Sequence, residues 1–227
     1  MKIRIGSMLL LAAVFALSSS VSAFAQLPCG VANQLACQPW DGGSNLFASQ
    51  NDTNGGGNFA TSYQQFTLAK GASYYDVESF HWVGGYFNPP AQGPITAWTL
   101  NLYNDAGGVP GAEIATGYFP GAGGETFIGN VNGYPIYVYW VYFHSFDMNP
   151  GTYWASVVPD LGFPPQWGWA TSTGTDPGYQ CFYGACGLTG SGFAYAVDGR
   201  PIPEPGTMLM LASGVLGLAG TLRRKLL

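Results

Sequence analysis

The sequence predicts an all-β domain over residues 26–200, folded as a two-sheet antiparallel sandwich. The first observation is that this stretch has no long run with the apolar spacing of a helix. The second is that short runs rich in β-branched and aromatic residues alternate with Gly, Pro, Asn and Asp clusters, in a chain with 34 glycines and 16 prolines. The third is the run Ile95–Tyr103, where Trp98, Leu100 and Leu102 alternate with more polar residues, the period of a half-buried strand.

Nine runs have strand character, and turn-forming clusters separate them. In chain order they are Ser62–Leu68, Tyr74–Trp82, Ile95–Tyr103, Ile114–Tyr118, Gly124–Ile128, Tyr134–Phe146, Gly151–Pro159, Gly168–Thr171 and Ala194–Asp198. The run Tyr134–Phe146 is apolar on both faces, so we expect it to lie centrally, with one face in the core and the other covered or offered to a ligand. Nine short strands in about 175 residues suit a jelly-roll-like sandwich.

The N-terminus predicts a secretory signal peptide over residues 1–25. Lys2 and Arg4 supply a basic start, an uncharged apolar run follows, and residues 23–25 form a small-x-small cleavage site. We therefore expect signal peptidase to release a mature chain that begins at Gln26. The alternative is an uncleaved N-terminal anchor.

The tail, residues 201–227, has three parts. They are the motif Pro203, Glu204 and Pro205, whose prolines break helices, the uncharged apolar residues 207–222, and the basic cluster Arg223, Arg224 and Lys225. As a transmembrane helix, residues 207–222 extend about 24 Å, and they can cross a hydrocarbon core of about 30 Å if the arginines snorkel and the bilayer thins. The basic cluster is expected to stay cytoplasmic, which places the rest of the chain outside.

In all three parts this tail resembles the PEP-CTERM sorting signal. The resemblance implies that an exosortase, a membrane enzyme similar to a transpeptidase, processes the chain near the Pro-Glu-Pro motif. It also implies a Gram-negative host that makes extracellular polysaccharide. It covers about 25 residues and indicates where the protein is sent, but not what it does. The alternative is a simple single-span anchor.

The exported part of the chain is acidic and has few cations. Of the seven basic residues, only Lys70 and Arg200 lie in residues 26–200, against eleven of the twelve acidic residues. So few cations cannot neutralise many phosphates, which argues against nucleic acid as a partner. Binding to anionic lipid headgroups is disfavoured for the same reason.

All four cysteines lie in this exported part, where an oxidising compartment favours disulfides. Proximity favours the pairs Cys29–Cys37 and Cys181–Cys186, and pairing between the two regions is the alternative. Because these spacings do not match zinc ribbons or fingers, we expect structural disulfides rather than a zinc site.

Several short motifs resemble β-sandwich ectodomains of bacterial surface proteins. They are Ser79-Phe80-His81-Trp82, the segment 99–111 that ends in Gly-Gly-Val-Pro-Gly, the segment 150–157 with Gly-Thr-Tyr-Trp, and Gln166-Trp167-Gly168-Trp169. The resemblance covers much of residues 60–200. It implies a surface sandwich without an assigned activity.

We expect no enzymatic activity, because no catalytic set is recognisable. Ser191 lacks the Gly-x-Ser-x-Gly turn of a hydrolase. His81 and His144, on expected strands between aromatic residues, are interpreted as structural. Asp76 and Glu78 form a close acidic pair on an expected strand. We expect them to lie at a sheet edge, where water solvates them, rather than to act as catalytic groups. A secreted glycan-acting hydrolase with two separated carboxylates remains the alternative.

The aromatic residues point more clearly to a ligand, because exposed rings stack on sugars. All seven tryptophans lie in residues 26–200, and Trp167 and Trp169, in a loop-like context, are the candidates for an exposed carbohydrate-binding platform. The tryptophans that we expect in the core are Trp82, Trp98, Trp140 and Trp154.

No cofactor or metal is expected, with calcium as the one candidate ion. Asp105 and Asp147 each lie near an asparagine in an expected loop, where their oxygens could bind calcium. No Asp-x-Asp-x-Asp array accompanies them.

Together these features predict a non-catalytic protein of the surface or extracellular matrix of a Gram-negative bacterium. Its precursor is expected in the inner membrane, and its expected ligand is extracellular polysaccharide. The glycan-acting hydrolase is one alternative function. A purely structural envelope protein without a ligand is the other.

Overall fold

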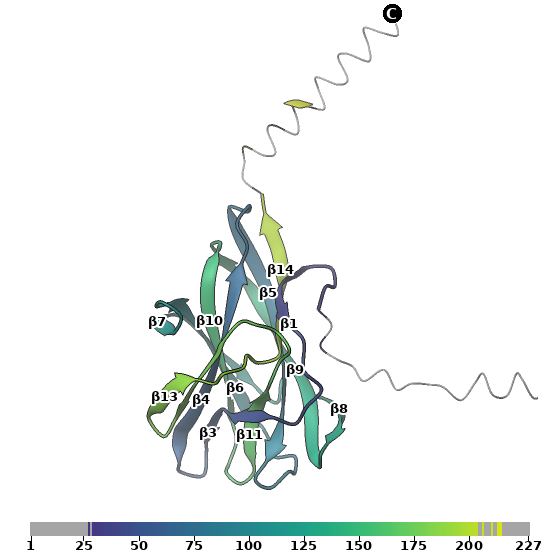
Figure 1. Cartoon of the computed structure of the whole chain (residues 1–227), viewed down its shortest axis with the longest axis vertical. Helices are drawn as coiled ribbons and strands as arrows, with labels where there is room; N and C mark the ends of the chain where they lie inside the picture. Colours follow the sequence, from purple (N-terminus) through teal and green to yellow (C-terminus); the bar gives the residue numbers. More distant parts are fainter. Residues whose placement is uncertain (1–26, 28, 204–205, 207–209, 211–212, 215–227) are drawn as a thin grey trace, which may run out of the picture.

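The computed structural model describes residues 27, 29–203, 206, 210, 213 and 214, which contain two β-sheets packed face to face (Figure 1). The expected all-β architecture with two sheets is confirmed. The signal peptide expected over residues 1–25 lies outside the described residues.

The first sheet is organised around the long strand β5. Its strands are β1 (Gln34–Gln38), β2 (Leu46–Ala48), β5 (Tyr74–Phe87), β8 (Thr126–Val131), β9 (Tyr134–Met148), β11 (Gln166–Ala170) and β14 (Tyr195–Ile202). Strand β9 runs along one side of β5, whereas β14 and β11 lie end to end along the other, with Tyr195 beside Trp82 and Trp169 beside Gly84. The sheet continues through β8 beyond β9, and through β1 and β2 beyond β14 and β11.

The second sheet has the order β13-β12-β4-β3-β10-β6-β7. Its strands are β3 (Gln50–Asp52), β4 (Gly57–Leu68), β6 (Ala97–Asp105), β7 (Pro110–Pro120), β10 (Gly151–Asp160), β12 (Gly178–Phe182) and β13 (Ala185–Leu188). Its pairings are antiparallel except for a parallel contact between Asn51 and Asp160. The expectation of a wholly antiparallel sandwich is wrong at this point. The chain changes sheets between β2 and β3 at Ser49, whose buried hydroxyl donates to the Val157 carbonyl oxygen at 2.6 Å.

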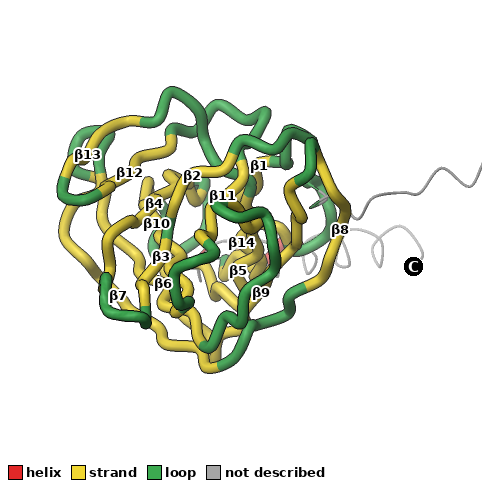
Figure 2. The backbone as a smooth tube through the Cα atoms, turned by 90° about the horizontal axis from the view of Figure 1, so that it is seen from below, coloured by secondary structure: helices red, strands yellow, loops and turns green. Residues whose placement is uncertain are grey.

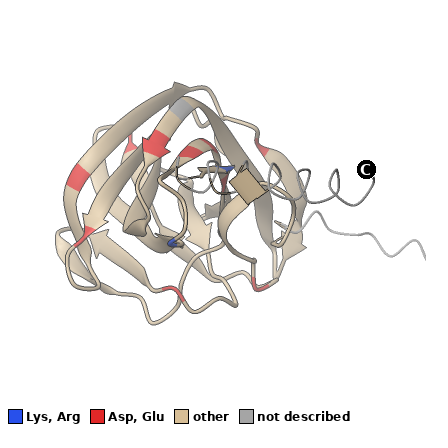
Figure 3. Ribbon diagram, turned by 90° about the horizontal axis from the view of Figure 1, so that it is seen from above, with Lys and Arg blue, Asp and Glu red and all other residues tan. Residues whose placement is uncertain are grey.

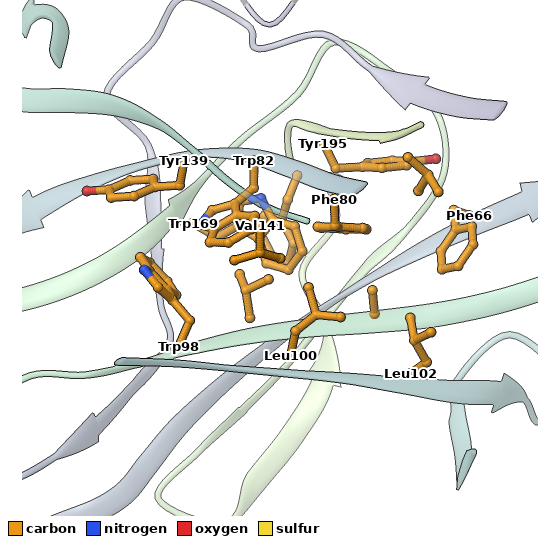
Figure 4. Close-up of a cluster of buried hydrophobic side chains, with 14 of the residues drawn as sticks. Phe66, Phe80, Trp82, Trp98, Leu100, Leu102, Tyr139, Val141, Trp169 and Tyr195 are labelled. Atoms are coloured by element: carbon orange, nitrogen blue, oxygen red, sulfur yellow. The ribbon is translucent and has the colours of Figure 1, made fainter. Parts of the chain in front are cut away.

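Aromatic side chains fill the space between the sheets (Figure 4). The alternation expected in Ile95–Tyr103 is confirmed, because Trp98, Leu100 and Leu102 are 0%, 3% and 6% exposed. Trp98 meets Trp82 and Tyr139 of the first sheet at ring-centroid distances of 4.8 and 5.0 Å. Seen along the long axis, the two sheets curve around this common interior (Figure 2). Removing so much aromatic surface from water is the main stabilising contribution of the core.

All nine expected strands overlap strands of the structure. The run Tyr134–Phe146 corresponds to β9, which lies between β5 and β8 as expected of a central strand. The short strands β1, β2, β3, β12 and β13 were not expected. The jelly-roll-like class stays a prediction.

The two ends of β5 mark the two ends of the domain. Ile202, the last residue of β14, pairs with Tyr74 at the start of β5, whereas Gln166 pairs with Phe87 at its end. The 14 residues of β5 extend about 40 Å at the usual rise of a strand. In Figure 1, β14 therefore ends at the top of the domain, and β3 and β11 lie at the bottom.

Candidate functional site

Four aromatic side chains cluster at the bottom of the sandwich, away from the C-terminal end of β14. They are Phe59, Phe163, Phe182 and Tyr183, here called the aromatic end. The centroid of the Phe59 ring lies 5.4 Å from Tyr183, 6.0 Å from Phe182 and 6.4 Å from Phe163. Phe163, Phe182 and Tyr183 are 39%, 40% and 75% exposed, so solvent reaches a group of contacting rings. Exposed apolar groups of this kind mark binding surfaces.

The hairpin of β12 and β13 presents two of these rings. Its turn consists of Tyr183 and Gly184, whose φ angles of 45° and 82° match a two-residue turn with positive φ at both positions. The Cys181–Cys186 disulfide joins the strands beside the turn, and the Tyr183 N–H donates to the Phe59 carbonyl oxygen at 2.8 Å. The hairpin backbone that carries both rings is therefore fixed without a ligand.

Asp52 fixes the loop that carries Phe163. Its carboxylate accepts the Phe163 N–H at 2.8 Å and, within its own turn, the amides of Asn54 and Gly56 at 2.9 Å each. These hydrogen bonds, that from Phe163 most of all, hold the pKa of Asp52 below its usual value. An ionised Asp52 thus ties together two loops at the aromatic end.

Gln166 lies between two cavities at this end. A cavity of about 240 Å³ is bordered by Phe87, and one of about 150 Å³ by Asp52 and Asn88, while Gln166 and Phe182 border both. Gln166 is 6% exposed, yet its side-chain amide makes no hydrogen bond to any residue that the structure describes. No sequence pattern singled out Gln166, Phe182 or Asp52 as functional.

Trp167 and Trp169 are wrong as candidates for an exposed platform, because both side chains are 0% exposed. The Trp167 ring meets Trp98 at 5.0 Å, and the Trp169 ring stacks on Phe193 at 5.3 Å. The Trp169 indole also donates to the Ala194 carbonyl oxygen at 2.8 Å. The local sequence of this segment predicts a loop, but the segment forms β11 between β5 and β2, and its two indoles point into the core.

His81 lies beside Ser79 and Asp198 on the face of the first sheet that is opposite Trp82. Its Nε2 is 3.0 Å from Ser79 Oγ and 2.9 Å from Asp198 Oδ2. Because both groups contact the same ring nitrogen, they do not form a hydroxyl–imidazole–carboxylate relay, which uses both nitrogens. Burial lowers the pKa of His81. Trp140 stacks beside it at 6.3 Å and is half-buried, so its expected place in the core is wrong.

Asp76 is buried, which corrects the expectation of an acidic pair solvated at a sheet edge. β5 is a central strand, and Asp76 is 5% exposed. Its Oδ2 accepts hydrogen bonds from Arg200 Nη2 at 2.7 Å and Nε at 3.0 Å. Glu78, which is exposed, lies 3.7 Å from the same Nε. Asp76 and Glu78 therefore bind Arg200 and link β14 to β5, instead of lying in water at a sheet edge.

The calcium candidates Asp105 and Asp147 lie in different sheets. Asp105 ends β6, and its carboxylate accepts hydrogen bonds from the Trp154 indole at 2.8 Å and the Gln65 amide at 3.0 Å. Backbone amides of the following turn, including that of Gly108 at 3.2 Å, donate to it as well. Asp147 is exposed on β9. Within the described part of the chain no three His, Cys, Asp or Glu side chains group as metal ligands.

The two expected disulfides are confirmed. Cys29 pairs with Cys37, and Cys181 pairs with Cys186, so each closes a local loop. Only the second lies at the aromatic end.

The tail begins inside the fold. Pro201 and Ile202 still belong to β14, and Pro203 follows directly. The other expected sorting residues, Glu204, Pro205, Arg223, Arg224 and Lys225, and most of residues 207–222, lie outside the described residues. In the portion that is described, no helix has the length and apolar character needed to cross a bilayer.

Comparison with known proteins bears on the tail alone. No curated protein and no solved structure matches the chain. Residues 201–225 match the family model of the PEP-CTERM protein-sorting motif. This match spans the Pro-Glu-Pro motif, the apolar segment and the basic cluster. The chain thus carries a PEP-CTERM motif at its C-terminal end and is an exported precursor that exosortase sorts.

Proposed function

We propose that this chain is a non-catalytic protein of the Gram-negative cell surface or extracellular matrix, and that it binds extracellular polysaccharide through the aromatic end. Signal peptidase removes residues 1–25, and residues 207–222 hold the precursor in the inner membrane until exosortase acts. The observation that carries the proposal is the group of exposed rings at Phe163, Phe182 and Tyr183 that contact the half-buried ring of Phe59.

These rings suit a sugar because the faces of many sugar rings present C–H groups. Such faces pack on aromatic rings, whose own faces carry partial negative charge. The Cys181–Cys186 disulfide closes the turn that carries Tyr183, and the Tyr183 ring already stacks on Phe59 at 5.4 Å, which lowers the ordering cost of binding. Preorganised rings of this kind favour a binding role.

The acids at the aromatic end support a non-catalytic role. Glycoside hydrolysis normally needs two carboxyl groups on opposite sides of the scissile bond. Of the residues that border the two cavities, Asp52 alone is acidic, and backbone amides engage its carboxylate. A binding role requires no second acid.

The test is binding of extracellular polysaccharide from the producing bacterium to the exported protein, purified from an exosortase-containing host. Tyr183→Ala is expected to weaken binding about tenfold, since a central aromatic contact is worth one to a few kcal/mol. The matched control is Tyr118→Ala, because Tyr118 is 65% exposed on β7 and borders neither cavity. Release of reducing ends from the polysaccharide is followed in parallel.

The outcomes separate the alternatives. Binding that Tyr183→Ala weakens and Tyr118→Ala leaves intact, without release of reducing ends, supports the proposal. Turnover of the polysaccharide defeats it in favour of a hydrolase. Failure to bind any polysaccharide defeats it in favour of a purely structural protein. Tyr183-dependent binding to phosphatidylcholine vesicles in place of polysaccharide defeats it in favour of a lipid surface.

A further inference from the structure

We infer that the aromatic end takes an uncharged polysaccharide, which lies across Phe182 and hydrogen-bonds through its hydroxyls to the Gln166 amide. The inference rests on the proposed function and names the chemical class of its ligand. Three features of the described residues carry it. They are the free hydrogen-bonding capacity of Gln166, the arrangement of the two cavities, and the distribution of charge.

Gln166 differs from the other buried glutamines of the domain. Gln50 donates to the Leu161 carbonyl oxygen at 2.8 Å and accepts the Trp167 N–H at 2.8 Å. Gln38 likewise accepts the Asp176 N–H at 2.7 Å, and its amide donates to backbone carbonyls. Burying an amide without a partner costs free energy, so buried amides are normally satisfied.

The amide of Gln166 has no partner among the described residues, but its polar atoms are not fully enclosed, and it borders both cavities, where a ligand can reach it. An amide offers two N–H donors and one carbonyl acceptor, and each sugar hydroxyl can both donate and accept. A polysaccharide hydroxyl at this position satisfies both sides of the amide. Recognition by such buried polar groups is selective, because a ligand without matching groups leaves them unpaired.

The two cavities set the path of the ligand. Both are bordered by Gln166 and Phe182, so they adjoin. Phe87 borders one of them and Tyr183 the other, so a chain that fills both passes over the Phe182 ring. A polysaccharide, which repeats its rings along a chain, fits this arrangement better than a single sugar.

Charge selects against an acidic polymer. In residues 27–203 as described, the cations are Lys70, which follows β4, and Arg200 in β14, both at the top of the domain. Acidic positions are spread around the domain (Figure 3). At the aromatic end, Asp52 borders the smaller cavity and its lowered pKa keeps it ionised. A uronate or sulfate there meets a negative charge without a compensating cation, which disfavours binding.

The experiment compares uncharged and anionic polymers on the same exported protein. Dextran, hydroxyethylcellulose and a galactomannan are the uncharged probes, and alginate and hyaluronate are the anionic ones. We expect retention by at least one uncharged polymer, and affinity for the anionic polymers at least about tenfold weaker. The comparison is repeated at high salt, where screening should weaken the discrimination.

A glutamine variant tests the contact itself. Gln166→Leu is expected to weaken binding of the uncharged polymer about tenfold without lowering the thermal midpoint, because the amide makes no hydrogen bond to the described residues. The matched control is Gln92→Leu, since Gln92 borders neither cavity and its amide donates to Glu125 at 2.9 Å. This control is expected to bind normally.

The outcomes distinguish this inference from the proposed function. Binding of alginate or hyaluronate as tight as that of the uncharged polymers overturns the inference and leaves the proposed function standing. Unchanged affinity in Gln166→Leu does the same. If no polymer and no host polysaccharide binds, the proposed function itself fails. The comparison of polymers on the unmodified protein does not depend on whether a variant folds.

Discussion

The indole rings of Trp98 and Trp167 meet edge to face between the two sheets, with centroids 5.0 Å apart and planes at 82°. Trp98 comes from β6 of the second sheet and Trp167 from β11 of the first. Aromatic pairs favour this geometry, because the positive edge of one ring meets the negative face of the other. The contact therefore fastens a short strand to the opposite sheet.

Trp167→Ala should lower the free energy of unfolding by about 3–5 kcal/mol, because it leaves a large cavity in the core. Trp167→Phe, which keeps a ring, should cost less. The measurement is chemical denaturation of the purified exported protein, followed by far-ultraviolet circular dichroism. Tyr142→Ala is the surface control, because Tyr142 is 69% exposed on β9, and it should change stability by no more than about 0.5 kcal/mol. A Trp167→Ala protein as stable as the original would contradict the burial described here.

Arg200 is expected to stabilise the C-terminal end of β14 through Asp76. Arg200→Ala leaves the Asp76 carboxylate, which is 5% exposed, without its guanidinium partner, so the thermal midpoint should fall. Arg200→Lys should restore part of the loss, since lysine keeps the charge but not the planar guanidinium. The effect should shrink in the Asp76→Asn background, and equal effects in both backgrounds would argue against coupling.

Asp105 should make stability depend on pH in the acid range. Hydrogen bonds, from the Trp154 indole most of all, hold the pKa of Asp105 below its usual value. Because the folded-state pKa is lowered, the stabilisation is complete above the unfolded value of about 3.9 and is lost as the pH falls through the folded value. The measurement is the thermal midpoint of the protein and of Asp105→Asn from about pH 6 to about pH 2.

The two midpoints should differ at the upper end of that range and approach each other at the lower end. Asp52, whose pKa is lowered too, titrates in both proteins, so their difference isolates Asp105. A constant difference at every pH would mean that the charge of Asp105 plays no part. Addition of calcium at neutral pH should leave the midpoint unchanged, because N–H donors already surround this carboxylate.

Processing of the tail should require exosortase. In a host without the enzyme, we expect a membrane-bound protein whose C-terminal peptide still ends at Leu227. In the parent host, mass spectrometry should find that peptide missing and β14 retained. Intact Leu227 on the protein of the parent host would count against processing of the motif.

The long strands could be predicted from sequence because their burial pattern is local. Ile95–Tyr103 alternates over enough positions to define one inner face, and β6 confirms it. Strands β2 and β3 have three residues each, too few for any period to show. They form because other strands pair with them: the distant β11 pairs with β2, and β4 with the distant β10 pairs with β3. Propensity within the segment carries no such information.

The candidate site was harder to predict, since exposure depends on which strands meet. Trp167 follows two prolines and reads as part of a loop, yet pairing with β5 and β2 buries it. Tyr183 did have a local signal. A cysteine pair five residues apart that encloses Tyr183 and Gly184 is typical of a tight hairpin with its side chains in solvent. Nothing near Gln166 in the sequence marks it as a side chain without a protein partner.

β14 is both the last strand of the domain and the start of the sorting motif, so it also determines how tension enters the protein. It pairs with β5 over eight residues, up to Ile202. A pull along the strand loads these backbone hydrogen bonds together in shear, whereas a pull across it would break them one after another. A copy retained at its tail and bound to polymer at its other end would carry the load along β14 and β5. The domain would then act as a tension-bearing link between the cell and its matrix.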